Sequence, residues 1–510
     1  MRAVEALWAL ALVLPWLLWG WHMRVRWSAG WESYFGWAVL PFAAYLFQLR
    51  WVNRPPAAPG AGKFARSGGM ILAITGSAIL SLSNIVLAPN PLWTTAAWIA
   101  CCGCAMATVG LLLERGGLSW VAHFLWIVLF PFLALPWPSS AHQHLVGPFR
   151  HGISSLVAEL ISTIFVPAVA SGTVIELPSG SLGVDAACSG IRSMQSALIC
   201  GFFLGELMRL RLRDRLLLLA GAGGIVVAAN FLRVLLLACV AASRGMAALG
   251  SWHDSIGNAE MLVVLVLVPC LALILFRRRG LAGVAVDPPA SPLSDHPSPM
   301  ILFATVGVLL AGGLLRFAWH RSASEHSAMH FATWRLQPAS VDWKEAPLDE
   351  GVRQTLGCRE SMLLVAGKGT PHTWIAAFLH WDGDPAYVYA AGEHSSEICL
   401  PNTGAVFEAL LPPWTVAAQG RSLEFERMRF SARGEPLHVF VLRWNVETAR
   451  SVSSQDLMDL ELDALRRSLV LELRYSPPIE KIIIAVSGYR NDDEARQRVE
   501  EVIPRLLRAE

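Results

Sequence analysis

The sequence predicts a polytopic α-helical membrane protein of about nine transmembrane helices, followed by a soluble C-terminal domain of the α/β (α+β) class. Of its 510 residues, 54% are hydrophobic and only 16% are charged, which is too apolar for a single soluble domain. Apolar runs long enough to cross a hydrocarbon core of about 30 Å recur until about His320. The net charge of +2 gives no basis for a nucleic-acid partner.

Nine apolar runs are predicted to span the membrane, and the second is the shortest of them. The first lacks a small-residue cleavage site and is followed by further spans, so we interpret it as an anchor and not as a signal peptide. The predicted spans are Val4–Trp21, Tyr34–Phe47, Gly69–Ala88, Trp93–Leu113, Leu118–Trp137, Gly190–Leu207, Leu216–Ala241, Glu260–Phe276 and Met300–Trp319.

The charges of the connecting loops predict the orientation, because loops on the cytoplasmic side carry an excess of Lys and Arg. With the N-terminus in the cytoplasm, the outer loops hold only Arg24, Arg26, Arg150 and Arg244. The inner loops then hold Arg50, Arg54, Lys63, Arg66, Arg115, Arg209, Arg211, Arg213, Arg215, Arg277, Arg278 and Arg279. We therefore expect a multi-pass protein of the bacterial inner membrane whose C-terminal domain is periplasmic.

A long outer segment, residues 138–187, separates the fifth and sixth spans. Its first part, HLVGPFRHGISSLVAELISTIFVPAVA, has the apolar spacing of a helix lying in the membrane interface. The following TVIELPSGSLGVDAA predicts two short extended pieces around a turn at Pro178-Ser179-Gly180. This β element either forms a peptide slot by strand addition or is a plain connection, and the sequence does not distinguish the two.

After the membrane part (1–279), residues 280–299 predict a Pro- and Ser-rich cytoplasmic linker, 300–319 the last transmembrane helix, and 320–510 the soluble domain. In that domain TWIAAFLHW, AYVYAAG, RMRFSAR, LHVFVLRW and KIIIAVSG are predicted strands, with a hairpin turn at Gly434-Glu435-Pro436. SSQDLMDLELDALRRSLVLELR and the closing DDEARQRVEEVIPRLLRAE are predicted helices.

Three residues that suit acyl transfer fall at the outer ends of predicted spans. Cys188 precedes the sixth span, where a helix N-terminus favours a thiolate; Arg233 lies in the outer part of the seventh; His253 precedes the eighth. Cys188 would be the nucleophile, Arg233 the oxyanion stabiliser and His253 the general acid and base of a cysteine-type protease or transpeptidase. Taken singly, a cysteine at the position of Cys188 is usually a packing residue, and His253 is equally an interfacial loop residue. An Arg within a span, by contrast, is functional or paired.

The stretches that carry these residues, ACSGIRS, NFLRV and HDSIG, resemble the three signature motifs of the exosortase/archaeosortase family. The resemblance covers roughly Leu118 to Phe276 and implies that Cys188, Arg233 and His253 match the proposed catalytic triad of that family. It also implies an integral membrane enzyme that cleaves exported proteins bearing a C-terminal Pro-Glu-Pro-type motif, a transmembrane helix and a basic tail. Transfer to an anchor, either a lipid or a glycan acceptor, is thought to follow.

In the C-terminal domain, GEHSSEICLPNTG (Gly392 to Gly404) is similar to the signature of the exosortase-associated domain. It departs from that signature after His394, where a nearby proline is missing, and at Ala405, where the family often has an aromatic residue. Cys358 and Cys399 are the two cysteines of this domain, and in an oxidising compartment we expect them to form a disulfide.

No cofactor or metal is expected. Cys101, Cys102 and Cys104 lack a second ligand pair and predict small-residue packing within the fourth span. Glu206 is expected to pair with the Arg209–Arg215 cluster, and either Glu260 or Asp254 is expected to orient His253.

A second function class stays open, namely a non-catalytic membrane component of surface polysaccharide export or assembly. The protease interpretation requires that the same genome encode client proteins ending in Pro-Glu-Pro, an apolar span and basic residues. Their absence would favour the second class.

Overall fold

The computed structural model describes residues 2–29, 34–56, 63–87, 93–137, 139–184, 190–278, 298–326, 333–348, 352–353, 356–367, 370–381, 396, 400, 405–432, 435–452, 471 and 478–509. The chain divides into two compact units, residues 1–169 with 175–318, and residues 170–174 with 319–510. The predicted strand AYVYAAG and nearly all of the predicted linker and of the predicted helix at 453–474 lie outside the described residues. Pro299, predicted as the last linker residue, is the first residue of the last transmembrane helix.

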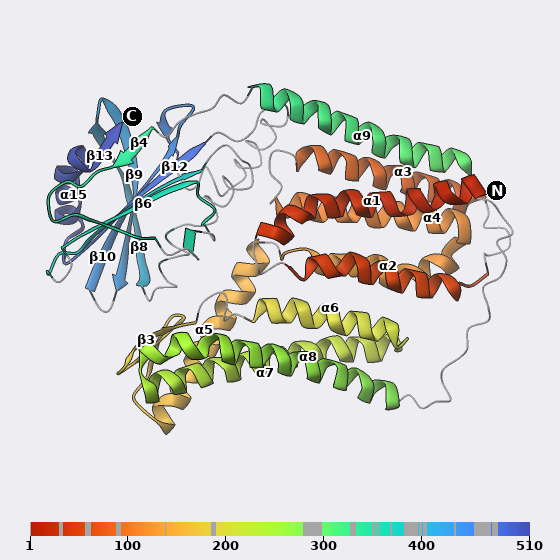
Figure 1. Cartoon of the computed structure of the whole chain (residues 1–510), viewed down its shortest axis with the longest axis horizontal. Coiled ribbons are helices and arrows are strands. Elements are labelled where there is room, and N and C mark those ends of the chain that lie inside the picture. The colour runs from red at the N-terminus through yellow and green to blue at the C-terminus, as the bar shows by residue number, and fades with distance from the viewer. Residues whose placement is uncertain are drawn as a thin grey trace. The chain divides into compact units, whose positions relative to one another are not determined.

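Helices make up the first unit (Figure 1). They are α1 (Arg2–Ala29), α2 (Gly36–Val52), α3 (Lys63–Val86), α4 (Thr94–Leu129) with the 3₁₀ turn η2 (Phe130–Ala134), α5 (Ser139–Ile164), α6 (Ile191–Leu207), α7 (Leu212–Arg244), the 3₁₀ turn η4 (Met246–Ala248), α8 (Leu249–Arg278) and α9 (Pro299–His326).

Six helices among the described residues are long and apolar enough to cross a membrane, which confirms a polytopic membrane protein. They are Val4–Ser28, Ala65–Val86, Thr94–Ala134, Leu212–Arg244, Ser255–Arg278 and Pro299–Ala323. The predicted second and sixth spans form the shorter helices α2, with 17 residues, and α6, also with 17.

The predicted fourth and fifth spans both lie in α4, which changes direction at Gly117. This glycine has φ 73° and ψ −167° inside an otherwise helical segment, a conformation that only glycine adopts readily. Trp98, near the start of α4, donates a hydrogen bond of 3.0 Å to the carbonyl of Pro136, just after its end. The two halves of α4 therefore run antiparallel as a helical hairpin.

Close backbone contact joins α3 to the first half of α4. A Cβ atom added at Gly69, Gly76, Gly103 or Gly110 would come within 3 Å of the facing backbone, so only glycine fits at these four positions. Cys101 and Cys104 are fully buried in the same layer, and Cys104 Sγ lies 3.3 Å from the carbonyl oxygen of Pro15. Both therefore pack as predicted, whereas Cys102, which was given the same role, is exposed.

Basic residues gather at one end of the helical unit, which we call the basic end and define by Arg50, Arg54, Arg115 and Arg215. At this end Arg50 and Arg215 both pair with Glu206 at the end of α6, which confirms the expected pairing of Glu206 with the Arg209–Arg215 cluster. Arg54 stacks on Trp51 and Trp120.

Helices α1 and α9 both start at the basic end and run to the opposite end. Arg115 contacts Glu5 at the start of α1 at 2.6 Å. Glu114, the residue before Arg115, accepts a hydrogen bond of 3.0 Å from the backbone of Ser298, where α9 begins. At the other end, Arg316 of α9 lies 2.8 Å from His22 of α1.

The segment between α5 and α6 forms a small antiparallel sheet of β1 (Val169–Ser171), β2 (Val174–Leu177) and β3 (Gly180–Gly183). The two predicted extended pieces are β2 and β3, and the turn between them is confirmed. Strand β1 occupies residues that the sequence had assigned to the end of the preceding helix, and α5 ends earlier, at Ile164.

The second unit is built on a sheet with the strand order β5-β6-β7-β12-β10-β9-β8, in which all neighbouring strands are antiparallel. The strands are β4 (Trp334–Leu336), β5 (Lys344–Ala346), β6 (Glu360–Ala366), β7 (Trp374–Trp381), β8 (Ala405–Ala418), β9 (Arg421–Ala432), β10 (Glu435–Asn445), β11 (Arg450–Ser451), β12 (Ile479–Ser487) and β13 (Leu507–Ala509). Helix α15 (Asp492–Leu506) packs one face through Ala495, Val499 and Ile503.

Two details of the predicted soluble domain are wrong. The hairpin turn is shorter than expected, because Glu435 and Pro436 already belong to β10 and pair with Ala432 and Ser431 of β9. The closing helix ends at Leu506, because residues 507–509 form β13, which pairs with β4 and buries Leu507.

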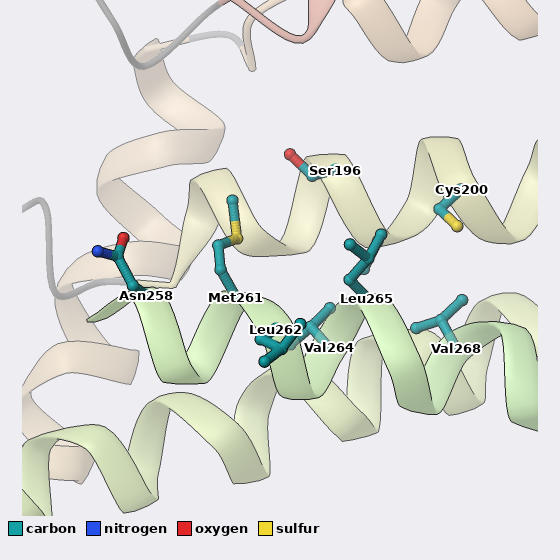
Figure 2. Close-up of a pocket in the computed structure, with 9 residues that line it drawn as sticks. Ser196, Cys200, Asn258, Met261, Leu262, Val264, Leu265 and Val268 are labelled. Carbon is teal, nitrogen blue, oxygen red and sulfur yellow. The ribbon is translucent and has the colours of Figure 1, made fainter. Parts of the chain in front are cut away.

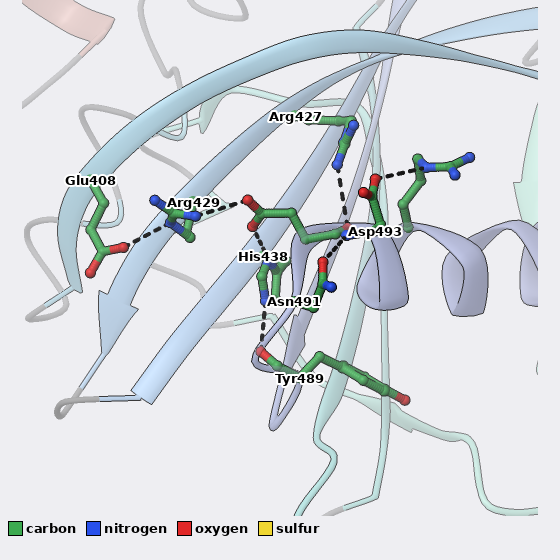
Figure 3. A network of polar contacts seen from close by, with 9 residues as sticks. Glu408, Arg427, Arg429, His438, Tyr489, Asn491 and Asp493 are labelled. Atoms are coloured by element: carbon green, nitrogen blue, oxygen red, sulfur yellow. Dashed lines mark hydrogen bonds and ion pairs between the residues drawn. The ribbon is translucent and has the colours of Figure 1, made fainter.

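A polar network holds the start of α15 against the sheet (Figure 3). Asp492 lies 3.0 Å from His438 Nδ1 and 2.8 Å from Arg429 Nη1, and Arg429 also contacts Glu408 at 2.9 Å. Asn491 caps the helix by accepting a hydrogen bond of 2.8 Å from the backbone of Asp493. These contacts give the residues a structural role in anchoring the helix.

Cys358 is a free, half-buried thiol in the structure, which is not the disulfide expected from the sequence. It packs against Leu379 and Trp381. Cys399, the expected partner, lies outside the described residues, as does nearly all of the stretch from Gly392 to Gly404.

Candidate active site

Helices α6, α7 and α8 pack against one another and bring the ends of the three sequence motifs to the same end of the helical unit (Figure 1). This end is opposite to the basic end, since α6 finishes at Glu206 and α7 begins near Arg215. We call it the motif end and define it by Gly190, Arg233 and His253. Cys188 itself lies outside the described residues.

Arg233 on α7 reaches across to α8 and contacts two of its side chains. Its Nη2 atom lies 3.4 Å from Nε2 of His253, and its Nη1 atom lies 3.4 Å from Oε2 of Glu260. The side chains of Arg233 and Glu260 are only 10% and 4% exposed. At such burial a lone charge would be costly, so Glu260 stabilises the guanidinium as its counter-charge.

Helical spacing on α8 explains how one arginine meets both partners. His253 and Glu260 are seven residues apart, which places them two turns apart on one face of the helix. Gly257 lies between them, and the guanidinium of Arg233 rests over it: a Cβ atom added there would be 3.4 Å from Nη2. A larger side chain at this position would push Arg233 off the face that carries His253.

Gly190 positions the start of α6 against α7. It has φ 71°, in the left-handed region, and a Cβ atom added to it would lie 3.1 Å from Cγ of Asn230. Asn230 is fully buried and lies three residues, or about one turn, before Arg233. The backbone two residues after Cys188 therefore packs one helical turn from Arg233.

Arg150 of α5 contacts the chain on the other side of Cys188. Its Nε atom donates a hydrogen bond of 2.8 Å to the carbonyl oxygen of Val184, and its Nη2 atom donates a second one to the same oxygen. Val184 precedes Cys188 by four residues. The short segment that contains the cysteine is thus held at Val184 by α5 and at Gly190 by α7.

The structure brings together two of the three residues predicted from the sequence, Arg233 and His253. It places Glu260 on Arg233, a contact that the sequence did not predict. The expected orientation of His253 by Glu260 or Asp254 stays a prediction, and the Asp254 side chain lies outside the described residues. Sequence reasoning missed Arg150 and Asn230. The signal available for Asn230 was its position in NFLRV, one turn before the arginine.

No candidate metal site accompanies this arrangement. Among the described residues, no group of three or more His, Cys, Asp or Glu side chains is placed to hold a metal ion. What the described side chains can do chemically is to transfer a proton at His253 and to stabilise negative charge at Arg233.

The family model described as transmembrane exosortase matches residues 27–270. The matched range contains α2 to α7 and most of α8, and with them all three motifs. This membrane part of the chain is therefore similar to the transmembrane exosortase family. No curated protein and no solved structure matches the chain.

Proposed function

We propose that the protein is a membrane-embedded cysteine protease and transpeptidase that cleaves C-terminal Pro-Glu-Pro-type sorting signals of exported proteins and transfers these proteins to an anchor. The observation that carries the proposal is the contact of Arg233 with His253. This contact lies at the same end of α6, α7 and α8 as Gly190, and Gly190 is two residues after Cys188.

In the proposed reaction, the thiolate of Cys188 attacks the carbonyl carbon of the scissile peptide bond. Arg233 stabilises the oxyanion that forms, with a contribution of roughly 2.7 to 4 kcal/mol for one good donor. His253 protonates the leaving amine, and later removes a proton from the incoming nucleophile. Glu260 holds the guanidinium in place through the contact at 3.4 Å.

The proposed orientation places the basic end in the cytoplasm and the motif end at the outer face of the bacterial inner membrane. Support comes from the gathering of Arg50, Arg54, Arg115 and Arg215 at one end of the helices, as the positive-inside rule requires. Because α9 runs from the basic end to the opposite end, it would deliver residues 320–510 to the periplasm. We propose that these residues are an exosortase-associated domain.

The experiment that tests the proposal is client processing in cells. Cys188→Ala and Cys188→Ser are expected to insert normally and to leave a tagged client unprocessed, because alanine has no nucleophile and serine is a far weaker one at neutral pH. The readout is the size shift of the client on an immunoblot. Cys270→Ala, in the part of α8 that is remote from His253, is the matched control. Normal processing by Cys188→Ala would overturn the mechanism.

A further inference from the structure

Four buried nitrogen donors at the basic end of the helical unit have no hydrogen-bond acceptor among the described residues. They are Nε1 of Trp8, Nε of Arg54, and both Nε and Nη1 of Arg115. The pocket between α6 and α8 differs in chemistry: Asn258 lines it near the candidate active site, and no charged side chain is among its described lining residues (Figure 2). Buried donors normally have acceptors, so the four at the basic end indicate a site that an acceptor group can occupy.

Aromatic rings hold these donors in one cluster, which we call the Arg54–Arg115 cluster and define by Glu5, Trp8, Trp51, Arg54 and Arg115. The Cζ atoms of Arg54 and Arg115 lie 4.5 Å and 5.9 Å from the ring centroid of Trp51. Arg115 also lies over the ring of Trp8, with its Cζ atom 4.6 Å from the centroid. Segments far apart in the sequence, namely α1, the end of α2 and the middle of α4, therefore bring both guanidinium groups to the same place.

The cluster carries two positive charges and one negative charge. Nη2 of Arg115 contacts the carboxylate of Glu5 at 2.6 Å, and the Arg115 side chain is only 1% exposed. Arg54 has no ion-pair partner among the described residues. Burial lowers the pKa of the Arg54 guanidinium and the nearby charge of Arg115 lowers it further, whereas Glu5 raises it. Because the two cations repel each other, an anion beside them would stabilise both.

The cluster lies at the end of the apolar part of the helices and opens to the surface. The membrane-spanning part of α1 begins at Val4, one residue before Glu5, and the Glu5 side chain is 36% exposed. Arg54 follows the end of α2 by two residues. Leu49 and Val52, which precede Arg54 on α2, are 37% and 56% exposed. A ligand can therefore place an anionic group on the guanidinium groups and an apolar part along α2.

We propose that the Arg54–Arg115 cluster binds the phosphate group of an anionic phospholipid, which is a structural ligand and takes no part in the chemistry at Cys188. Guanidinium groups bind phosphate oxygens through charge-assisted hydrogen bonds, and basic pockets between membrane helices bind lipid headgroups. The exposed apolar residues Leu49 and Val52 favour a lipid over free phosphate.

The charge of the cluster also selects among phospholipids. The excess positive charge favours a headgroup of net negative charge, such as that of phosphatidylglycerol. The ammonium group of phosphatidylethanolamine would instead approach two guanidinium groups, which is unfavourable. The proposal requires only that the helices span a membrane, and it is independent of the proposed reaction.

Thermal unfolding of the purified full-length protein in detergent, with and without added lipid, tests the proposal. A ligand that binds only the folded state stabilises it, so phosphatidylglycerol is expected to raise the melting temperature more than phosphatidylethanolamine does. Inorganic phosphate supplies the anion without acyl chains and is expected to have a smaller effect. Equal effects of the two lipids would overturn the proposal, and an effect of inorganic phosphate as large as that of phosphatidylglycerol would overturn the assignment to a lipid.

The variant Arg54→Gln tests the site itself, because it removes a partly exposed guanidinium that has no ion-pair partner among the described residues. The affinity for phosphatidylglycerol, measured from the dependence of the melting temperature on lipid concentration, should fall about tenfold or more, as expected for a lost hydrogen bond to a charged group. Arg213→Gln is the matched control, since it removes one positive charge from an exposed side chain at the basic end of α7. An unchanged affinity in Arg54→Gln, or an equal loss in both variants, would overturn the proposal.

A second variant, Glu5→Gln, tests the buried arginine. It removes the carboxylate that contacts Arg115, so the protein should be less stable without lipid, because a buried charge has lost its partner. The lipid phosphate would then take over as the counter-charge. The rise in melting temperature caused by phosphatidylglycerol should therefore be larger in Glu5→Gln than in the wild type. An equal or smaller rise would show that the lipid does not reach Arg115 and would overturn the proposal.

Discussion

Replacing Arg233 by lysine keeps the positive charge but removes the separate N–H donors of the guanidinium, so it tests which of the two client processing needs. In the structure two different nitrogen atoms of the guanidinium face two different partners, Nη2 toward His253 and Nη1 toward Glu260, each at 3.4 Å. A lysine ammonium is a single point that cannot occupy both places, although it keeps the charge. It would remain with the buried carboxylate of Glu260, the stronger electrostatic partner, and move away from His253.

The size of the effect follows from the geometry. If Arg233 is the donor to the oxyanion, its displacement costs roughly 2.7 to 4 kcal/mol of transition-state stabilisation, or a rate of client processing lower by about 100- to 1,000-fold. Because the positive charge next to Glu260 is retained, the free energy of unfolding should change far less than when a buried pair is broken, which costs about 3 to 5 kcal/mol.

The assay is a time course of client cleavage by detergent-solubilised protein, with thermal unfolding measured on the same samples. Arg244→Lys is the matched control, since Arg244 ends the same helix, lies at the motif end and stacks on the exposed Trp252. Cleavage by Arg233→Lys at the wild-type rate would show that the residue is only a counter-charge and would refute the reasoning.

Three further predictions concern the positioning of the cysteine segment and the C-terminal domain. Gly190→Ala should lower processing and destabilise the protein by about 1–2 kcal/mol, since alanine is strained at φ 71° and its Cβ would press on Asn230; a wild-type melting temperature would contradict this. Arg150→Met removes both donors to the carbonyl of Val184 and should therefore slow client processing and the alkylation of Cys188. An unchanged rate of processing would show that this contact does not position the cysteine. Burial raises the pKa of the Cys358 thiol, so its thiolate fraction at about pH 8 is below that of an exposed cysteine. Labelling of Cys358 by iodoacetamide, followed by mass spectrometry, should therefore be slow at about pH 8 and faster as the pH rises. Fast labelling at about pH 8 would contradict the buried position.

The membrane architecture was predictable because each span is a local property of the sequence. Apolar runs and loop arginines can be recognised without knowing what they contact, and even the hairpin within α4 could be anticipated from the Gly116-Gly117 break between two runs. The site residues Arg233 and His253 were recognisable for the same reason, since their motifs are contiguous stretches of sequence.

The features that the sequence did not reveal depend on partners far along the chain. From the sequence Arg150 could be recognised only as a charged loop residue, because its hydrogen-bond acceptor is the backbone carbonyl of Val184, 34 residues further along the chain. The contact between Glu260 and Arg233 was not predicted because the two residues lie on different helices. Strand β8 was missed because Pro412 and Pro413 interrupt its pattern, although prolines are tolerated there at a bulge on the edge of the sheet.

The central claim is that Cys188 carries the client as a thioester, and trapping that intermediate tests it most directly. A client peptide is mixed with the full-length protein, the reaction is stopped in acid within its first turnover, and the peptide containing Cys188 is analysed by mass spectrometry. The account predicts a mass increase on Cys188 equal to the N-terminal part of the client, which is removed by hydroxylamine. Turnover of the client with no adduct on Cys188, together with continued turnover by Cys188→Ala, would contradict it.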